Sequence, residues 1–217
     1  MHRLLAIYVG CIALSAAAET PDFSKGGVVV SLQYGAGFWN VNQEKLRPQV
    51  GADHASQLAA DLKNSSTGIL RAGYNILGHA TIAAELAGTG WDIFSQSRGG
   101  AGFLTGTAKW HPLQLVYGDQ PRPIPIDAGV SLGLGYGIAG QNRGGDGLVW
   151  DTALEGEYYF TPWLAAGIGM RLYFLNFSNF YLDYDHRSDP ANTIPLPNGS
   201  GGTFFTLGLS LVFRTTP

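Results

Sequence analysis

A two-residue hydrophobic repeat runs through the last part of the chain. In the segment Thr203–Phe213, alternate positions are mostly apolar, and most residues between them are small or carry a hydroxyl group. Successive side chains of a β-strand point to opposite faces, so as a strand this segment has one apolar face and one small, nearly uncharged face. A segment of this length with these two faces is typical of a membrane-spanning β-strand whose apolar face contacts lipid.

Seven earlier segments repeat this alternation. They are Val28–Trp39, Leu70–Ile76, Ala80–Gly88, Phe103–His111, Ile126–Ile138, Trp150–Phe160 and Leu164–Phe174. One such segment is a weak signal, but eight in one chain are hard to obtain by chance, and closed bacterial barrels have an even number of strands. The pattern therefore predicts an all-β fold, an eight-stranded antiparallel transmembrane up-and-down β-barrel.

The lengths of the links between these segments agree with a barrel that crosses an outer membrane. The links Leu77–His79 and Thr161–Trp163 are short, whereas Asn40–Thr67 and Asn176–Gly202 are long and polar. Short periplasmic turns and longer outer loops are the rule for such barrels, so we expect both termini on the periplasmic side. The link Pro112–Pro125 departs from this rule, because it is long for a periplasmic turn.

Aromatic residues fall near the ends of the predicted strands, where Tyr158 and Phe160 precede the tight turn at Pro162. All five tryptophans follow this rule: Trp39, Trp91, Trp110, Trp150 and Trp163. Aromatic side chains gather at the two membrane–water interfaces, so we expect these residues to form interfacial girdles.

Composition agrees with a small membrane barrel. Only 13% of the 217 residues are charged and 31 are glycine, whereas soluble domains average about 25% charged residues and about 7% glycine. The net charge of −3 offers no basic surface, so we expect no nucleic-acid partner.

The N-terminus has the features of a secretory signal. A short basic start at Met1–Arg3 precedes the apolar run Leu4–Leu14, and Ala16–Ala18 matches a cleavage site. We therefore expect a signal peptide at residues 1–18 and one barrel domain at 19–217. Cleavage before Cys11 would instead give a lipoprotein, but it would leave a very short apolar region.

Charged residues within the predicted strands all fall on the face turned away from lipid. These are Arg71, Glu85, Lys109, Asp127, Asp151, Glu155, Glu157 and Arg171. A charge facing lipid at mid-membrane costs about 2–4 kcal/mol, and side chains roughly fill the interior of an eight-stranded barrel. We therefore expect a lumen charge network of ion pairs that plugs the barrel, with Arg171 beside Glu155 and Glu157. The alternative is a charged pore for small solutes.

Catalytic chemistry has weak support in the sequence. The outer-loop run His186–Asp189 holds a histidine, a serine and an acid, the residue types of a lipid-modifying hydrolase, but adjacent loop residues rarely converge as a triad. His79 and His111 are expected to be interfacial residues, because no ligand-like spacing joins them to other metal ligands. We expect no enzyme activity, no catalytic residue, no cofactor and no metal, with a lipid-modifying enzyme kept as an alternative.

The chain from about Gly27 to Phe213 resembles small eight-stranded outer-membrane barrels of the OmpA, OmpX and OmpW type. The resemblance is one of pattern, and it implies the bacterial outer membrane of a Gram-negative envelope. It also implies that the barrel assembly machinery reads the C-terminal strand, which ends in an aromatic residue at Phe213. Only Arg214–Pro217 follow that residue, so the signal is not quite terminal.

Three short runs resemble barrels of myxobacteria, some of which are associated with gliding-motility complexes. The runs are Arg71–Asn75, Trp110–Leu113 and Glu157–Pro162. This resemblance implies a barrel component of an envelope motility complex as a further alternative.

The two long outer loops are the expected functional surface, because rigid barrels present variable function on loops. The first, Asn40–Thr67, is expected to carry a short helix near Asp53–Lys63, and the second is Asn176–Gly202. The leading hypothesis is a structural or interaction barrel with a largely plugged lumen. Its expected partners are outer-membrane lipid and other envelope or surface proteins.

Overall fold

The computed structural model describes residue 22 and residues 25–62, 64–76, 78–91, 99–117 and 125–215. The predicted signal peptide at residues 1–18 lies outside this part of the chain. So do residues 92–98, which are half of the predicted link between the third and fourth strands.

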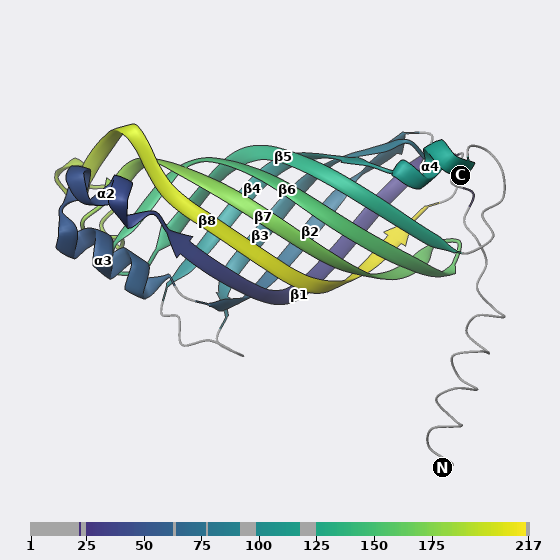
Figure 1. Ribbon diagram of the computed structural model, residues 1–217, viewed down its shortest axis with the longest axis horizontal. Coiled ribbons are helices and arrows are strands. Elements are labelled where there is room, and N and C mark those ends of the chain that lie inside the picture. Colours follow the sequence, from purple (N-terminus) through teal and green to yellow (C-terminus); the bar gives the residue numbers. More distant parts are fainter. Residues whose placement is uncertain are drawn as a thin grey trace, which may run out of the picture.

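Eight antiparallel strands close into a barrel in sequence order, which confirms the predicted fold class (Figure 1). The strands are β1 (Gly27–Val41), β2 (Ser65–Ile76), β3 (Ala80–Trp91), β4 (Gly100–Trp110), β5 (Ile126–Gly140), β6 (Gly144–Thr161), β7 (Leu164–Tyr181) and β8 (Thr193–Arg214). Pairing of β1 with β8, from Val29 opposite Arg214 to Val41 opposite Gly202, closes the ring. Closure leaves no strand with an unpaired edge in lipid.

Short helices cover the two ends of the barrel (Figure 1). At one end, α2 (Gln43–Val50) and α3 (Ala52–Asp61) connect β1 to β2, so the helix expected near residues 53–63 is present and a second helix precedes it. The opposite end carries α4 (Pro112–Tyr117) and the described C-terminal residue Thr215. None of the helices in the described residues is long and apolar enough to cross a membrane.

The strands at the α2–α3 end are longer than the sequence pattern predicts. The stretch Asn176–Gly202, expected to be a loop, is largely strand, because β7 runs to Tyr181 and β8 begins at Thr193. The 3-10 turn η1 (Pro190–Asn192) lies at its tip. The link between β5 and β6 is likewise reduced to Gln141–Arg143, a short turn at the end where longer loops were expected. These extensions hold glycine and polar residues, and pairing with neighbouring strands stabilises them.

An apolar belt surrounds the barrel. The predicted lipid-facing positions are exposed, with Leu32, Leu132 and Leu209 at 55%, 64% and 72%. Aromatic residues lie toward both edges of this belt. Trp110 and Trp163 are exposed near the α4 end, and Trp150 stacks on Phe174, with ring centroids 3.7 Å apart, toward the α2–α3 end. A continuous exposed apolar surface of this kind is expected of a barrel embedded in lipid.

The predicted interfacial position of Trp39 is wrong. Its side chain points into the barrel and stacks on Phe204, with ring centroids 4.4 Å apart. It occupies the lumen phase of β1, the same phase as Gln33, so an aromatic residue at a strand end faces lipid only when the alternation places it there. The side chain of Trp91 lies outside the described residues.

Candidate functional site

Strand register brings acids and bases from different strands into one layer of the lumen. Arg71 on β2 lies opposite Glu85 on β3, with Nη2 of Arg71 3.0 Å from Oε2 of Glu85. The same guanidinium crosses the lumen to Glu155 on β6, at 2.5 Å. Both carboxylates also contact Arg171 on β7 at 3.0 Å. Two of these contacts, Arg71 with Glu155 and Arg171 with Glu85, span the interior of the barrel and join strands that do not pair with one another.

Lys109 and Asp151 extend this layer. The ammonium group of Lys109 lies 3.0 Å from Glu155 and pairs closely with Glu157, whereas Arg171 pairs closely with Asp151. The expected contact between Arg171 and Glu157 is not made, because Lys109 and the hydroxyl of Tyr159 occupy Glu157. Ion pairs therefore join seven of the eight predicted residues, and the charged side chains hold one another inside the barrel.

Asp127, the eighth predicted residue, lies nearer the α4 end. Its Oδ2 is 2.5 Å from Nδ1 of His111, and Nε2 of His111 is 2.9 Å from the Thr81 hydroxyl. His111 is 5% exposed inside the lumen, so its expected interfacial position is wrong. His111 follows the lipid-facing Trp110 by one residue, so the alternation of β4, extended by one position, predicts that its side chain faces the lumen. His79 is exposed at the β2–β3 turn.

Thr81, His111 and Asp127 have the residue types of a catalytic triad, but their setting resembles that of a structural cluster. All three are at most 5% exposed, and Asn75 also contacts the histidine. The adjoining cavity measures about 20 Å³, room for about one water molecule. A nucleophile needs space for its substrate beside it, and this cavity is far too small for a lipid.

Aromatic residues fill the next layer toward the α2–α3 end. Phe103 stacks on Tyr173 with ring centroids 4.8 Å apart, and Phe204 lies between Trp39 and these two rings. The hydroxyl of Tyr173 donates a hydrogen bond to Glu85 at 2.9 Å, which ties the aromatic layer to the charged one. The alternation of the predicted strand Leu164–Phe174 places Tyr173 on the same lumen face as Arg171, but the local pattern does not indicate this hydrogen bond.

The α2–α3 hairpin closes this end of the barrel. Leu46 of α2 and Leu58 of α3 are fully buried in the same apolar cluster as Phe103, Phe177 and Phe204. We call this cluster and the hairpin the apolar plug. Seen from the α4 end, the lumen thus contains a histidine layer, a charged layer, an aromatic layer and the helical hairpin. Buried side chains from all four obstruct a direct path along the axis.

The loop at the tip of β7 and β8 does not assemble a triad. Nδ1 of His186 lies 2.8 Å from Oδ2 of Asp183. Asp189 meets the histidine only through a backbone hydrogen bond from its N–H to the His186 carbonyl at 3.0 Å, and among the described residues no hydrogen bond or ion pair joins the imidazole to the side chain of Ser188 or Asp189. The hydrogen bond between the two side chains raises the pKa of His186 and lowers that of Asp183. No group of three or more His, Cys, Asp or Glu in the described ranges could hold a metal ion.

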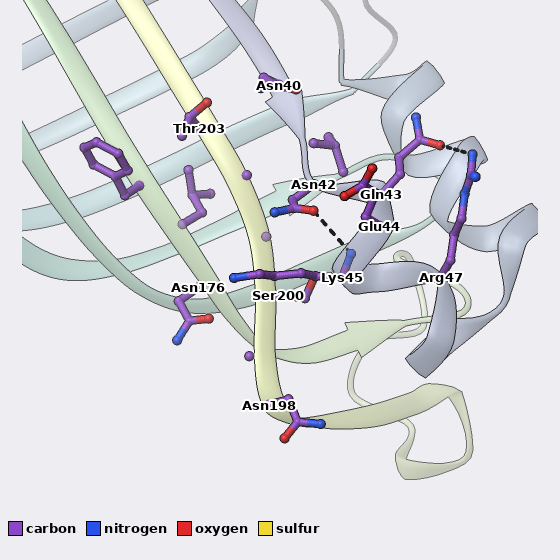
Figure 2. Close-up of a pocket in the computed structure, with 16 residues that line it drawn as sticks. Asn40, Asn42, Gln43, Glu44, Lys45, Arg47, Asn176, Asn198, Ser200 and Thr203 are labelled. Carbon is purple, nitrogen blue, oxygen red and sulfur yellow. Dashed lines mark hydrogen bonds between the residues drawn. The ribbon is translucent and has the colours of Figure 1, made fainter.

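The outer wall at the α2–α3 end carries a polar groove of about 640 Å³, drawn in Figure 2. Residues of β1, α2, β7 and β8 line it. Because the longer connections and the helical hairpin lie at this end, we assign it to the cell exterior and the α4 end to the periplasm.

Comparisons with known proteins identify the fold. No family model matches the sequence, and no curated protein matches it. Among solved structures, the Neisserial surface protein A superposes with a TM-score of 0.57 at 10% identity, covering 88% of this chain and 99% of that one.

Two other outer-membrane structures align over nearly all of their own chains with TM-scores below 0.5. The N-terminal barrel domain of Pseudomonas aeruginosa OprF gives 0.43 at 13% identity, covering 88% of this chain and 100% of its own. The Yersinia pestis attachment protein Ail gives 0.45 at 14% identity, covering 88% and 99%. The fold, the apolar belt and the aromatic girdles together place this protein in the bacterial outer membrane as an integral β-barrel.

Proposed function

We propose that the protein is a non-conducting outer-membrane barrel that acts as a structural and interaction component through its outer end. The observation that carries this proposal is the filled lumen, in which a layer of ion pairs and the apolar plug lie one above the other. An eight-stranded barrel has an interior just wide enough for side chains to fill, so little space remains for solute.

The partners that suit this role are outer-membrane lipid around the belt and envelope or surface proteins at the outer end. The helical hairpin and the extended β7–β8 hairpin present polar surface there on a rigid barrel. We propose no catalytic role, because neither His186 nor His111 has a nucleophile, an acid and open space around it. The motility-complex alternative rests on short sequence runs alone.

Single-channel recording of the refolded full chain in a planar bilayer tests the proposal. We expect no conductance from the wild type. We also expect none from Arg171→Ala, because the apolar plug lies above the charged layer and its own side chains still fill the lumen when that one side chain is shortened. Steady conductance of the wild type, with ion selectivity altered by Arg171→Ala, would establish the small-solute pore and overturn the proposal.

A further inference from the structure

The outer groove is formed where β8 leaves regular pairing. Ser200 opposes Phe177, but the next register pair is Pro195 with Asn179, so residues 196–199 of β8 face the single residue Ser178 of β7. Gly199 within this bulge has φ +56°, a conformation that glycine adopts readily. The bulge, the start of α2 and the end of β1 together enclose the groove (Figure 2).

The groove begins at the outer edge of the apolar belt. Phe174 lines it and also belongs to the outer aromatic girdle, through its stacking on Trp150. Two residues beyond Phe174 on β7, the outward side chain is Asn176, and two residues beyond Phe38 on β1 it is Asn40. Both asparagines line the groove. A molecule in this groove therefore contacts ring surface on the membrane side and amides on the outer side. An amphiphile at the outer leaflet meets both of these surfaces.

Two cations, Lys45 and Arg47, and one acid, Glu44, line the groove, so its net positive charge and its amides suit an anionic, hydroxyl-rich ligand. Lys45 extends from α2 toward β8 in Figure 2, and its ammonium group has no hydrogen-bond or ion-pair partner in the described part of the chain. The asparagine side chains supply both donors and acceptors, which sugar hydroxyls require.

We propose that this groove binds the anionic saccharide headgroup of a glycolipid in the outer leaflet. The inference rests on the proposed function, in which the outer end is the working surface. Lys45 holds a phosphate or carboxylate group, the amides of Asn40, Asn176 and Asn198 bind sugar hydroxyls, and Phe174 contacts the start of the acyl region. The position at the belt edge favours a membrane lipid over a soluble saccharide.

Binding of deep-rough lipopolysaccharide, which is lipid A with phosphorylated inner-core sugars, tests this inference. The refolded full chain in micelles is titrated with fluorescent lipopolysaccharide and, in parallel, with phosphatidylglycerol. We expect Lys45→Ala to weaken lipopolysaccharide binding about tenfold, the effect of losing one charged hydrogen bond. Asn198→Trp, at an exposed position on the groove wall, should weaken it at least as much by filling the space.

Lys25→Ala is the matched control, because it removes the same charge from an exposed site near the opposite end, and we expect unchanged affinity. Equal affinity of wild type, Lys45→Ala and Asn198→Trp would overturn the inference, as would equally tight binding of phosphatidylglycerol. Equally tight binding of the delipidated saccharide would overturn the assignment to a membrane lipid. None of these results alters the bilayer recording, so the proposed function can stand when the glycolipid site fails.

Discussion

Glycines on the lumen face of β5 make room for the side chains that fill the barrel. A Cβ atom at Gly129 would collide with the aliphatic stem of Lys109, and one at Gly133 would collide with the Asp151 carboxylate. A Cβ at Gly137 would lie 2.6 Å from the Phe103 ring. The glycines on the lumen face of β5 thus leave the space that large side chains of the neighbouring strands occupy.

Gly137→Ala should destabilise the barrel by about 1–3 kcal/mol, because Phe103 is held between Tyr173 and Phe204 and cannot shift easily. Urea unfolding of the refolded protein in micelles measures this loss. Gly156→Ala is the matched control, since nothing lies within 4 Å of a Cβ at that position, and it should leave the unfolding midpoint unchanged. Equal midpoints for both variants would show that the aromatic layer tolerates extra volume.

At the scale of elements, the α2–α3 hairpin is stabilised by tertiary packing. Both helices are short, of 8 and 10 residues, and isolated helices of that length are marginal in water. Gly51, at φ +91°, allows the chain to turn between them. Leu46 and Leu58 then bury completely against the aromatic layer, so the hairpin and the filled lumen stabilise each other.

Leu58→Ala should reduce the local stability of the hairpin by about 2–5 kcal/mol, the usual range for a fully buried leucine. Native-state trypsin digestion detects this opening as faster cleavage after Lys45 in α2; the bond after Arg47 resists trypsin because Pro48 follows it. Leu115→Ala removes the same side-chain atoms at a site in α4 that is 68% exposed. In this control variant, cleavage after Lys45 should match the wild type. Unchanged cleavage in Leu58→Ala would mean that the hairpin does not depend on the plug.

For the whole molecule, the β1–β8 seam turns a sheet into a barrel. Phe213 lies in this seam, opposite Val30 on one side and Leu164 on the other, and its ring is 44% exposed in the periplasmic part of the belt. Because the seam pairs the first strand with the last, it can form only after the whole chain is present. Recognition of β8 by the assembly machinery would guide this closing step.

Phe213→Ala should therefore lower the amount of folded barrel in the outer membrane of cells several-fold while leaving refolding in micelles nearly unchanged. Heat-modifiable mobility in gel electrophoresis measures both quantities. Phe205→Ala, on the same face of β8 toward its outer end, is the control and should assemble normally. Equal losses in cells and in micelles would mean that Phe213 contributes stability and no assembly signal.

The sequence alone determined the number of strands, their lipid-facing phase and the inward position of the charged residues. These properties follow from the two-residue period of a strand and from the cost of placing charge in lipid; the facing of each residue is visible within a single segment, and counting the segments gives the number of strands. The alternation around Leu132 and Leu209 therefore predicts the belt, and the same rule places Arg71 and Arg171 in the lumen.

Only the tertiary structure decided which acid meets which base, how far the outer strands extend and what closes the outer end. Arg71 meets Glu155 across the lumen because of barrel curvature and register, which no local pattern encodes. The glycine-rich start of β6 is a strand because its neighbours pair with it, and Trp39 turns inward to fill space above the charged layer. These outcomes depend on contacts between distant segments, so they appear only when the barrel closes.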